Sequence, residues 1–419
     1  MTRTLSIETD RLYETLTELG RIGAYDDEPT GLVGVRRPAL SDEDKAARER
    51  VIAWMRELGL SVSVDAIGNI FAERSGADDT LAPVMFGSHV DSVPTGGRFD
   101  GALGVLGALE IVRLLDEQSI ATRRPLVVGV FTDEEGCRFG TDMLGSAVAT
   151  GRILLEDAYA LRDERGLSVG DELERIGFRG TEPVGRRNPH AFVECHVEQG
   201  PTLTRDGVDI GVVDRVQAIS WFELTIHGRA AHAGATPTAF RIDAGLSASR
   251  LNVRLRELVE GGVYGELRAT MGVMRPSPGM VNVIPGVMHV TVDLRNPDDA
   301  MMIAAEDAMR EFLGEIEKRD GVRINLRQTA RTDVVPFAET VQAIIGASAE
   351  ARGLSRMSLF AGAGHDAQEW ARRCPTAMVF VPGEHDGISH NPRELSTPGQ
   401  CANGINVLLD TVLQLAEQS

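Results

Sequence analysis

The sequence is poor in cysteine and has no long apolar run. Its four cysteines are far apart and form no CxxC pair, so we expect free thiols in a reducing compartment and no disulfide framework. No stretch approaches the roughly 18 consecutive apolar residues that a membrane helix needs. The first ten residues also lack the apolar core of a signal peptide. These absences predict a cytoplasmic protein.

Positive charge is scarce as well. Lys45 and Lys318 are the only lysines, and 43 basic residues stand against 62 acidic ones, which gives a formal net charge of −19 over 419 residues. That charge repels polyphosphate and anionic lipid head groups, so we expect neither nucleic acid nor a membrane as a partner. Apolar residues make up 42% of the chain, enough for a sizeable folded core.

The apolar pattern predicts an α/β domain with a mostly parallel central sheet. Helical patterns at 101–117, 338–352 and 398–417 alternate with short, nearly continuous apolar runs, which are typical of strands buried on both faces. These runs lie at 83–88, 125–131, 191–197 and 376–381. Nearer the N-terminus, we expect a helix at 41–59, started by a capping box of Ser41 and Asp44, and a strand within 61–73.

The middle of the chain has a different pattern. Helical patterns at 243–258 and 298–317 alternate there with amphipathic strands, which predicts an α+β sandwich. The strands are expected at 217–227, 268–275, 287–294 and 322–328. Because this segment interrupts the α/β pattern, we predict a discontinuous catalytic domain, residues 1–212 and 330–419, and an inserted lid and dimerisation domain, residues 213–329.

Imidazole and carboxylate groups follow the ends of the predicted parallel strands. His89 and Asp91 follow the first strand, Glu134 and Glu135 the second, and His196 lies at the end of the third. Ligands of an open parallel sheet bind beyond the carboxyl ends of its strands. Converging imidazoles and carboxylates are typical of a divalent transition-metal site.

Neighbouring residues suggest how such a site would work. Asp91 is close enough in sequence to fix the ring of His89 through its other nitrogen. Of the adjacent Glu134 and Glu135, one can bind metal while the other moves a proton. Each signal alone is weak, since a His-x-Asp pair is usually structural and paired glutamates usually form a solvated turn. Their joint placement at strand ends favours a functional site.

Two sequence strings carry a family resemblance. Residues 87–92 (GSHVDS) and 96–105 (GGRFDGALGV) resemble the dinuclear-metal amidohydrolases of the M20 aminoacylase/carboxypeptidase superfamily. The branch that the chain resembles contains hydantoinase/carbamoylase enzymes: N-carbamoyl-L-amino acid hydrolases, allantoate amidohydrolases and β-ureidopropionases. Further matching segments are DEEG at 133–136, HVEQGP at 196–201, GRAAHAGATP at 228–237, NVIP at 282–285, DLRN at 293–296, GAGHDAQ at 362–368 and GISH at 387–390.

The resemblance implies a centre of two divalent metal ions, which could be zinc, manganese, cobalt or nickel. Asp100 would bridge them, with His89 and His196 on one ion and Glu135 and His390 on the other. Glu134 would be the general base, and Asp91 would also belong to the catalytic group. His385 is a rival to His390, but the matching segment surrounds His390.

The resemblance also implies substrate contacts. His232 would reach the substrate carbonyl, in cis or across a homodimer. Asn282 and Arg295 would hold the substrate carboxylate, and Gln199 would add a contact near the metals. The loop from Gly362 to Gly364 would line the same pocket. His365 and Asp366 could form a catalytic pair or shape the pocket, and Cys137 is expected to be a spectator.

The implied function is metal-dependent hydrolysis of the ureido group of N-carbamoyl-L-α-amino acids. A water shared by the two metals would attack the ureido carbon, and the products would be an L-amino acid, ammonia and carbon dioxide. Allantoate and N-carbamoyl-β-alanine are alternative substrates, because they share the ureido group and a carboxylate. Aminoacylase or dipeptidase activity is a further alternative. A binding or scaffold protein on an inactive hydrolase fold would lack a ligand, yet every implied ligand is present.

Overall fold

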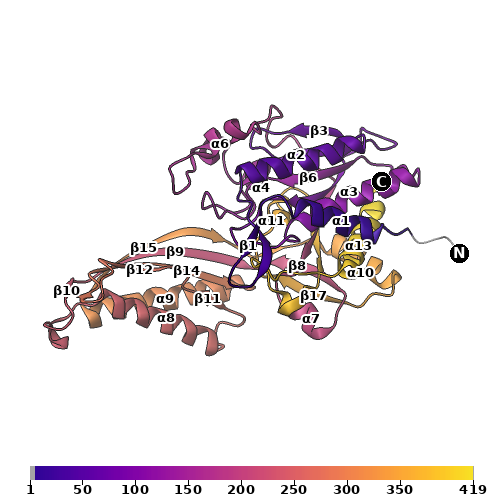
Figure 1. The fold of residues 1–419 in the computed structure, drawn as a ribbon. Coiled ribbons are helices and arrows are strands. Elements are labelled where there is room, and N and C mark those ends of the chain that lie inside the picture. The colour runs from indigo at the N-terminus through magenta and orange to yellow at the C-terminus, as the bar shows by residue number, and fades with distance from the viewer. Residues whose placement is uncertain (1–4, 419) are drawn as a thin grey trace. The chain divides into compact units, whose positions relative to one another are not determined.

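The computed structural model describes residues 5–418. The first four residues, which belong to the N-terminal segment in which we expected no signal peptide, lie outside the described residues. The chain forms two compact units (Figure 1). The first runs up to Arg215 and resumes at Pro336, and the second is Val216–Val335. The second unit is therefore one continuous segment inserted into the first; we had placed the insertion at residues 213–329.

A nine-stranded sheet forms the centre of the first unit, in the order β16-β8-β18-β7-β5-β6-β4-β3, with β17 also pairing with β8. The four central strands, β18, β7, β5 and β6, pair in parallel, and antiparallel strands flank them. All residues of these four strands are buried, which explains their continuous apolar runs. The strands are β3 (Ser61–Val64), β4 (Ile70–Arg74), β5 (Val84–His89), β6 (Leu126–Phe131), β7 (Ala191–Val197), β8 (Ile210–Val216), β16 (Val335–Pro336), β17 (Arg356–Ala361) and β18 (Thr376–Val381).

Helices cover this sheet. Helices α3 and α13 pack on β5 and β7, α11 packs on β7 and β18, and α4 packs on β6. The mostly parallel sheet with covering helices confirms the predicted fold class. The helices of the first unit are α1 (Thr9–Leu19), α2 (Asp42–Glu57), α3 (Ala102–Glu117), α4 (Leu144–Thr150), α5 (Leu155–Ala160), α6 (Val169–Ile176), α7 (Thr202–Asp206), α10 (Glu339–Ala351), α11 (Asp366–Trp370), α12 (Glu384–Gly387) and α13 (Pro398–Ala416).

Two local predictions were wrong. Residues 61–73 form two antiparallel strands, β3 and β4, because the Asp65 carboxylate accepts hydrogen bonds from the backbone of Ile67 and Asn69 and closes a turn between them. The capping box of α2 is half formed. Ser41 accepts the backbone N–H of Asp44, but the Asp44 carboxylate binds Arg48 and the N–H of Leu40 instead.

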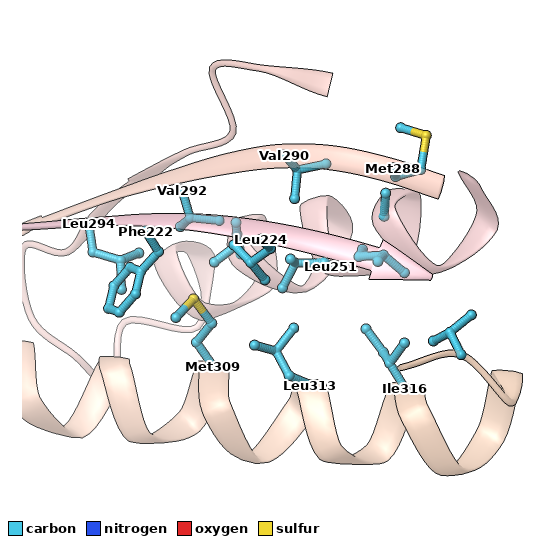
Figure 2. Packing of buried hydrophobic residues seen from close by; sticks show 14 of the residues in the cluster. Phe222, Leu224, Leu251, Met288, Val290, Val292, Leu294, Met309, Leu313 and Ile316 are labelled. Atoms are coloured by element: carbon cyan, nitrogen blue, oxygen red, sulfur yellow. The ribbon is translucent and has the colours of Figure 1, made fainter. Parts of the chain in front are cut away.

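The second unit is a five-stranded antiparallel sheet with two helices. Strand β9 (Ala218–His227) lies between β14 (Val287–Asn296) and β15 (Arg323–Thr332), while β11 (Arg268–Thr270) and β12 (Met274–Ser277) both pair with β14. Strands β9 and β14 alternate between buried and more exposed residues, as an amphipathic sheet requires. The buried side chains meet helices α8 (Ala244–Glu260) and α9 (Asp299–Asp320) in one core, where Phe222, Leu294 and Met309 lie close together (Figure 2).

A hairpin and a second two-stranded sheet complete the description. Strand β1 (Ala24–Asp27) pairs with β2 (Leu32–Val35) in the first unit, and β10 (Ala231–His232) pairs with β13 (Val283–Ile284) in the second. A short 3-10 helix, η1, spans Thr238–Phe240. Within residues 5–418, no helix combines the length and apolarity required to cross a membrane.

Candidate metal centre

The first unit brings the five predicted metal ligands together beyond the carboxyl ends of β5, β6 and β7. One group of side chains whose ligand atoms all lie within 4.8 Å of one another is His89, Asp100 and His196. A second such group is Asp100, Glu135 and His390. Asp100, at the start of the turn into α3, belongs to both groups, as a carboxylate between two metal ions must.

The first group is buried. Oδ1 of Asp100 lies 3.4 Å from Nε2 of His89 and 3.1 Å from Nε2 of His196. Nδ1 of each ring contacts a backbone carbonyl, that of Asp91 at 3.1 Å for His89 and that of Val197 at 2.9 Å for His196. Because Nδ1 donates its proton to these carbonyls, Nε2 of both rings is left to face Asp100.

The charge around these rings favours a cation. Burial lowers the pKa of His89, but the negative charges of Glu134, Asp100 and Asp91 raise it well above its usual value. Nε2 of His89 is buried and has no hydrogen-bond partner among residues 5–418. An imidazole nitrogen in this position fits a metal ion, because the same negative field that attracts a proton attracts a divalent cation.

The second group is more open to solvent. Nε2 of His390 lies 3.1 Å from Oε2 of Glu135 and 3.5 Å from Oδ2 of Asp100, and the His390 side chain is 49% exposed. Burial opposes protonation of His390, but Glu135 and then Asp100 raise its pKa to about 9. Among the residues that the structure describes, the ligand groups contain His390 and not its rival His385.

Glu134 lies beside both groups and belongs to neither. Its Oε2 is 3.5 Å from Nε2 of His89, and its side chain is 9% exposed. Burial raises the pKa of Glu134 well above its usual value. The charge of His89 lowers this pKa, whereas the charges of Asp366 and Glu135 raise it further. A carboxyl group that can take up and release a proton beside a metal centre has the properties of a general base.

Asp91 contacts the backbone of the turn that carries Glu134 and Glu135. Its carboxylate lies 3.4 Å from the backbone nitrogens of Glu134 and Glu135, which donate to it. Nδ1 of His89 is closer to the Asp91 backbone carbonyl, at 3.1 Å, than to the carboxylate, at 3.7 Å. Burial raises the pKa of Asp91 to about 6. The backbone carbonyl of Asp91 thus holds the ring of His89, whereas the sequence had suggested that the Asp91 carboxylate would do so.

Gly101 is required by this arrangement. Its φ of +62° lies in the left-handed region, and a Cβ atom at this position would be 2.4 Å from Nε2 of His89. Its backbone N–H also donates to Nε2 of His196 at 3.0 Å. A side chain here would therefore displace the ring of His89, a predicted metal ligand.

Three polar side chains contact Asp100 or its backbone. Gln199, which we predicted near the metals, donates from Nε2 to Oδ2 of Asp100 at 2.7 Å. Ser389 donates to the same oxygen at 2.8 Å, and Glu394 accepts the backbone N–H of Asp100 at 3.1 Å. The sequence analysis missed Ser389 and Glu394. Ser389 lies inside the matching GISH segment, whereas no sequence signal singled out Glu394.

The loop that carries Gly362 and Gly364 also lies in the first unit, between β17 and α11. His365 follows it, and its ring centroid is 4.5 Å from that of His196. Both ring nitrogens of His365 are buried and have no hydrogen-bond partner in the described part of the chain, and burial lowers its pKa well below the usual value. The loop therefore adjoins the metal centre through a neutral imidazole.

The second unit places His232 and Asn282 together. The backbone N–H of Ala233 donates to the carbonyl of Asn282 at 2.9 Å, and His232 pairs with Val283 in the two-stranded β10–β13 sheet. Nδ1 of His232 accepts hydrogen bonds from the backbone of Gly234 and Ala235, at 3.0 and 3.1 Å. The ring proton therefore lies on Nε2, which makes this exposed nitrogen a donor.

Arg295 lies at the other end of the same unit. In β14, Val287 pairs with His227 and Arg295 with Ile219, so about 27 Å of extended strand separates Val287 from Arg295. Asn282 directly precedes β13, which lies just before the Val287 end of β14 in the chain. The structure thus separates Asn282 from Arg295, two residues predicted to hold the same substrate carboxylate. The Arg295 guanidinium contacts the Asp293 carboxylate at 3.0 Å.

Comparison with known proteins tests the family resemblance. The model of peptidase family M20/M25/M40 matches residues 85–414. The chain belongs to this family. An N-carbamoyl-L-amino-acid amidohydrolase of Rhizobium meliloti is 40% identical over 98% of this chain and 97% of its own length. A ureidoglycolate hydrolase of Oryza sativa subsp. japonica is 34% identical over 98% of this chain and 86% of its own length.

A solved structure gives the same picture. The amidase of the hydantoinase/carbamoylase family from Burkholderia vietnamiensis superposes with a TM-score of 0.93 at 41% identity, and the match covers 100% of both chains. The predicted branch of the family is therefore confirmed together with the fold.

Proposed function

We propose that this chain hydrolyses the ureido group of N-carbamoyl-L-α-amino acids to the L-amino acid, ammonia and carbon dioxide. The observation that carries the proposal is Asp100, whose carboxylate belongs to two groups of metal-ligand atoms. Relatives named for this reaction, at 40% and 36% identity over nearly the whole chain, support the substrate class. The broader assignment is a hydrolase that acts on C–N bonds of linear amides.

The proposed cofactor is a pair of divalent metal ions. His89 and His196 would hold one ion, Glu135 and His390 the other, and Asp100 both. Imidazole and carboxylate ligands without thiolate suit zinc, manganese, cobalt or nickel. When bound, the two ions supply positive charge that lowers the pKa of a water molecule and polarises the ureido carbonyl.

The proton transfers are assigned to Glu134. It takes one proton from the attacking water, and it then gives that proton to the nitrogen that leaves as ammonia. The carbamate that remains loses carbon dioxide and leaves the amino acid. A single carboxyl group can serve in both steps because it can hold the proton between them.

His232 and Arg295 are assigned to the substrate. The Nε2 proton of His232 can donate to the carbonyl oxygen as negative charge develops on it. The Arg295 guanidinium can hold the α-carboxylate through two parallel hydrogen bonds. To do so it must exchange its present partner, Asp293, for the substrate.

The separation within the second unit supports a homodimer. An amino-acid-sized substrate cannot span the roughly 27 Å that separates the Arg295 end of β14 from the end that lies next to the β10–β13 sheet. If all these residues act on one substrate, His232 and Asn282 come from one copy of the chain and Arg295 from another. We therefore propose a dimer in which each active site uses both copies. The four free cysteines support a reducing, cytoplasmic compartment.

A second candidate function is hydrolysis of a different ureido acid. The relative from Oryza sativa is named a ureidoglycolate hydrolase, and solved structures of a similar protein hold glyoxylate and (S)-hydroxyglycine. Allantoate, ureidoglycolate and N-carbamoyl-β-alanine share the ureido group and the carboxylate with the proposed substrate. They differ in what lies between these groups.

The test is a matrix of metals and substrates. The protein is stripped with a chelator, reloaded with zinc, manganese, cobalt or nickel, and assayed for ammonia release. We expect the highest kcat/KM with N-carbamoyl-L-amino acids such as N-carbamoyl-L-methionine, and little turnover of the D-enantiomer. Allantoate, ureidoglycolate, N-carbamoyl-β-alanine, dipeptides and N-acyl amino acids complete the panel. Higher kcat/KM on any of these would transfer the assignment to that substrate, and turnover that survives chelation would contradict the metal centre.

A further inference from the structure

A buried carboxylate outside the proposed ligand set joins the two loops that form the metal centre. Glu394 lies in the turn after His390 and is 7% exposed. One of its oxygens, Oε1, accepts the backbone N–H groups of Phe99 at 2.8 Å and of Asp100 at 3.1 Å. Its other oxygen, Oε2, lies 2.6 Å from the hydroxyl of Ser389.

Ser389 extends this connection to the bridging carboxylate itself. Its hydroxyl lies 2.8 Å from Oδ2 of Asp100, so it stands between two carboxylates. Glu394 therefore reaches Asp100 by two routes, through the backbone nitrogen and through Ser389. Ser389 also directly precedes His390, so the same contacts hold the second metal-ligand loop.

The backbone here needs such support. His390 has a φ of +55°, a conformation that costs a non-glycine residue free energy unless its surroundings hold it. The turn closes through the N–H of Glu394, which donates to the carbonyl of Asn391 at 2.9 Å. On the opposite loop, the hydroxyl of Thr95 donates to the carbonyl of His390 at 3.1 Å.

The opposite loop is also shaped around Glu394. A Cβ atom at Gly97 would lie 2.4 Å from Oε1 of Glu394 and 2.5 Å from its Cβ, although the Gly97 backbone is outside the left-handed region. The absence of a side chain at Gly97 thus leaves room for the Glu394 carboxylate. These contacts give Glu394 a role that packing alone does not explain.

We propose that Glu394 is a positioning residue that sets Asp100 and His390 at the separation required to bind two metal ions. This inference rests on the proposed two-metal function. Partners that orient metal ligands typically change metal affinity about 10- to 100-fold when they are removed. Glu394 contacts Asp100, which belongs to both ligand groups, and also the loop that carries His390. Its loss should therefore weaken binding of the ion held by Glu135 and His390 more than binding of the ion held by His89 and His196.

The test compares metal binding in four variants of the full-length chain. Glu394→Ala removes all the contacts, whereas Glu394→Gln keeps an oxygen for the two backbone N–H groups and an amide that can donate to Ser389. Gly97→Ala crowds the carboxylate without changing any polar group. Glu110→Ala is the control, because Glu110 is also buried and accepts a backbone N–H, that of Glu8, on helix α3.

Metal content after dialysis, titration calorimetry and the visible spectrum of the cobalt form are the measurements. Glu394→Ala should retain one ion and bind the second about 10- to 100-fold more weakly, with an altered cobalt spectrum and a lower kcat. Gly97→Ala should change in the same direction, and Glu394→Gln should bind both ions almost as the wild type does. Glu110→Ala should bind both ions normally, even if it unfolds at a lower temperature.

Two results would overturn the proposal. One is a folded Glu394→Ala or Gly97→Ala protein that binds two ions with wild-type affinities. The other is equal metal loss in Glu110→Ala. If Glu394→Ala does not fold, Gly97→Ala and Glu394→Gln still decide the matter. A wild-type protein that binds no metal would contradict the proposed function itself, and this outcome is separate from both.

Discussion

At the scale of single residues, the two adjacent glutamates have different surroundings. Glu135 shares a ligand group with Asp100 and His390, and its Oε1 accepts the backbone N–H of Val93 at 3.2 Å. Glu134 faces His89 from a buried position and belongs to no ligand group among the described residues. These surroundings fit the proposed division of roles between the two neighbours, metal binding for Glu135 and proton transfer for Glu134.

We predict that Glu134→Gln lowers kcat by a factor of about 10² to 10⁴, because glutamine cannot take a proton from water. Metal content should stay at the wild-type value, and ammonia release together with elemental analysis measures both quantities. The matched variant is Glu135→Gln, which should lose metal as well as turnover. Full turnover in Glu134→Gln would refute its assignment as the base.

At the scale of secondary-structure elements, a buried arginine that is paired within helix α2 connects this helix to the sheet. Nε of Arg48 lies 2.8 Å from Oδ2 of Asp44, and both side chains are fully buried. The Arg48 guanidinium also donates to the carbonyl of Gly68 and to the hydroxyl of Thr132, the residue that follows β6. Arg48 therefore connects helix α2 to Thr132, which precedes Glu134 by two residues in the sequence.

We predict that Arg48→Met destabilises the protein by about 3–5 kcal/mol, because it leaves the buried Asp44 carboxylate without its partner. The double variant Asp44→Asn/Arg48→Met should lose less, since neither member of the buried pair keeps its charge. Arg50→Met is the control on the same helix. Its ion pair with Glu18 is exposed and should contribute no more than about 1 kcal/mol. Urea unfolding measures all three, and additive losses in the double variant would contradict the argument.

The elements also show what the sequence could and could not predict. The buried strands β5, β6, β7 and β18 were predicted within a residue or two, because continuous apolar runs between turns have few other interpretations. Helix α1 was missed, although Leu12, Leu16 and Leu19 are buried at helical spacing. The hairpin β1–β2 has mostly exposed residues and gave no such pattern.

The grouping of the proposed ligand side chains was predictable to a similar degree. The proposed ligands lie in matching motifs at strand ends, so both topology and resemblance indicated them. Glu394 was not predictable, because its contacts with Phe99 and Asp100 join residues nearly 300 positions apart in sequence. The separation of Asn282 from Arg295 also needed the strand register, since only 12 residues lie between them along the chain.

At the scale of the whole molecule, the proposed dimer makes a quantitative prediction. Glu134→Ala removes the base from its own site, and His232→Ala removes a donor from its partner's site. When the two inactive variants are mixed in equal amounts and allowed to exchange subunits, about half of the dimers should be hybrids, each with one intact site of two. About a quarter of wild-type activity should therefore return.

The unmixed variants and a mixture held below the exchange temperature are the controls. A mixture that stays inactive after exchange, with hybrids verified by native mass spectrometry, would place His232 in the active site of its own chain. Sedimentation of the wild-type chain tests the simpler requirement that it dimerises.

The division of the first unit into two chain segments has a consequence for synthesis. All strands of the second unit come from one uninterrupted segment, Val216–Val335, so it can fold as soon as that segment has left the ribosome. The central sheet must wait for β18, which lies between β7 and β8. His89, Asp100 and His196 are already available at that stage, whereas His390 arrives last. If the proposed ligands are correct, a chain that stops before residue 390 carries every ligand of the buried group but lacks His390 of the second group.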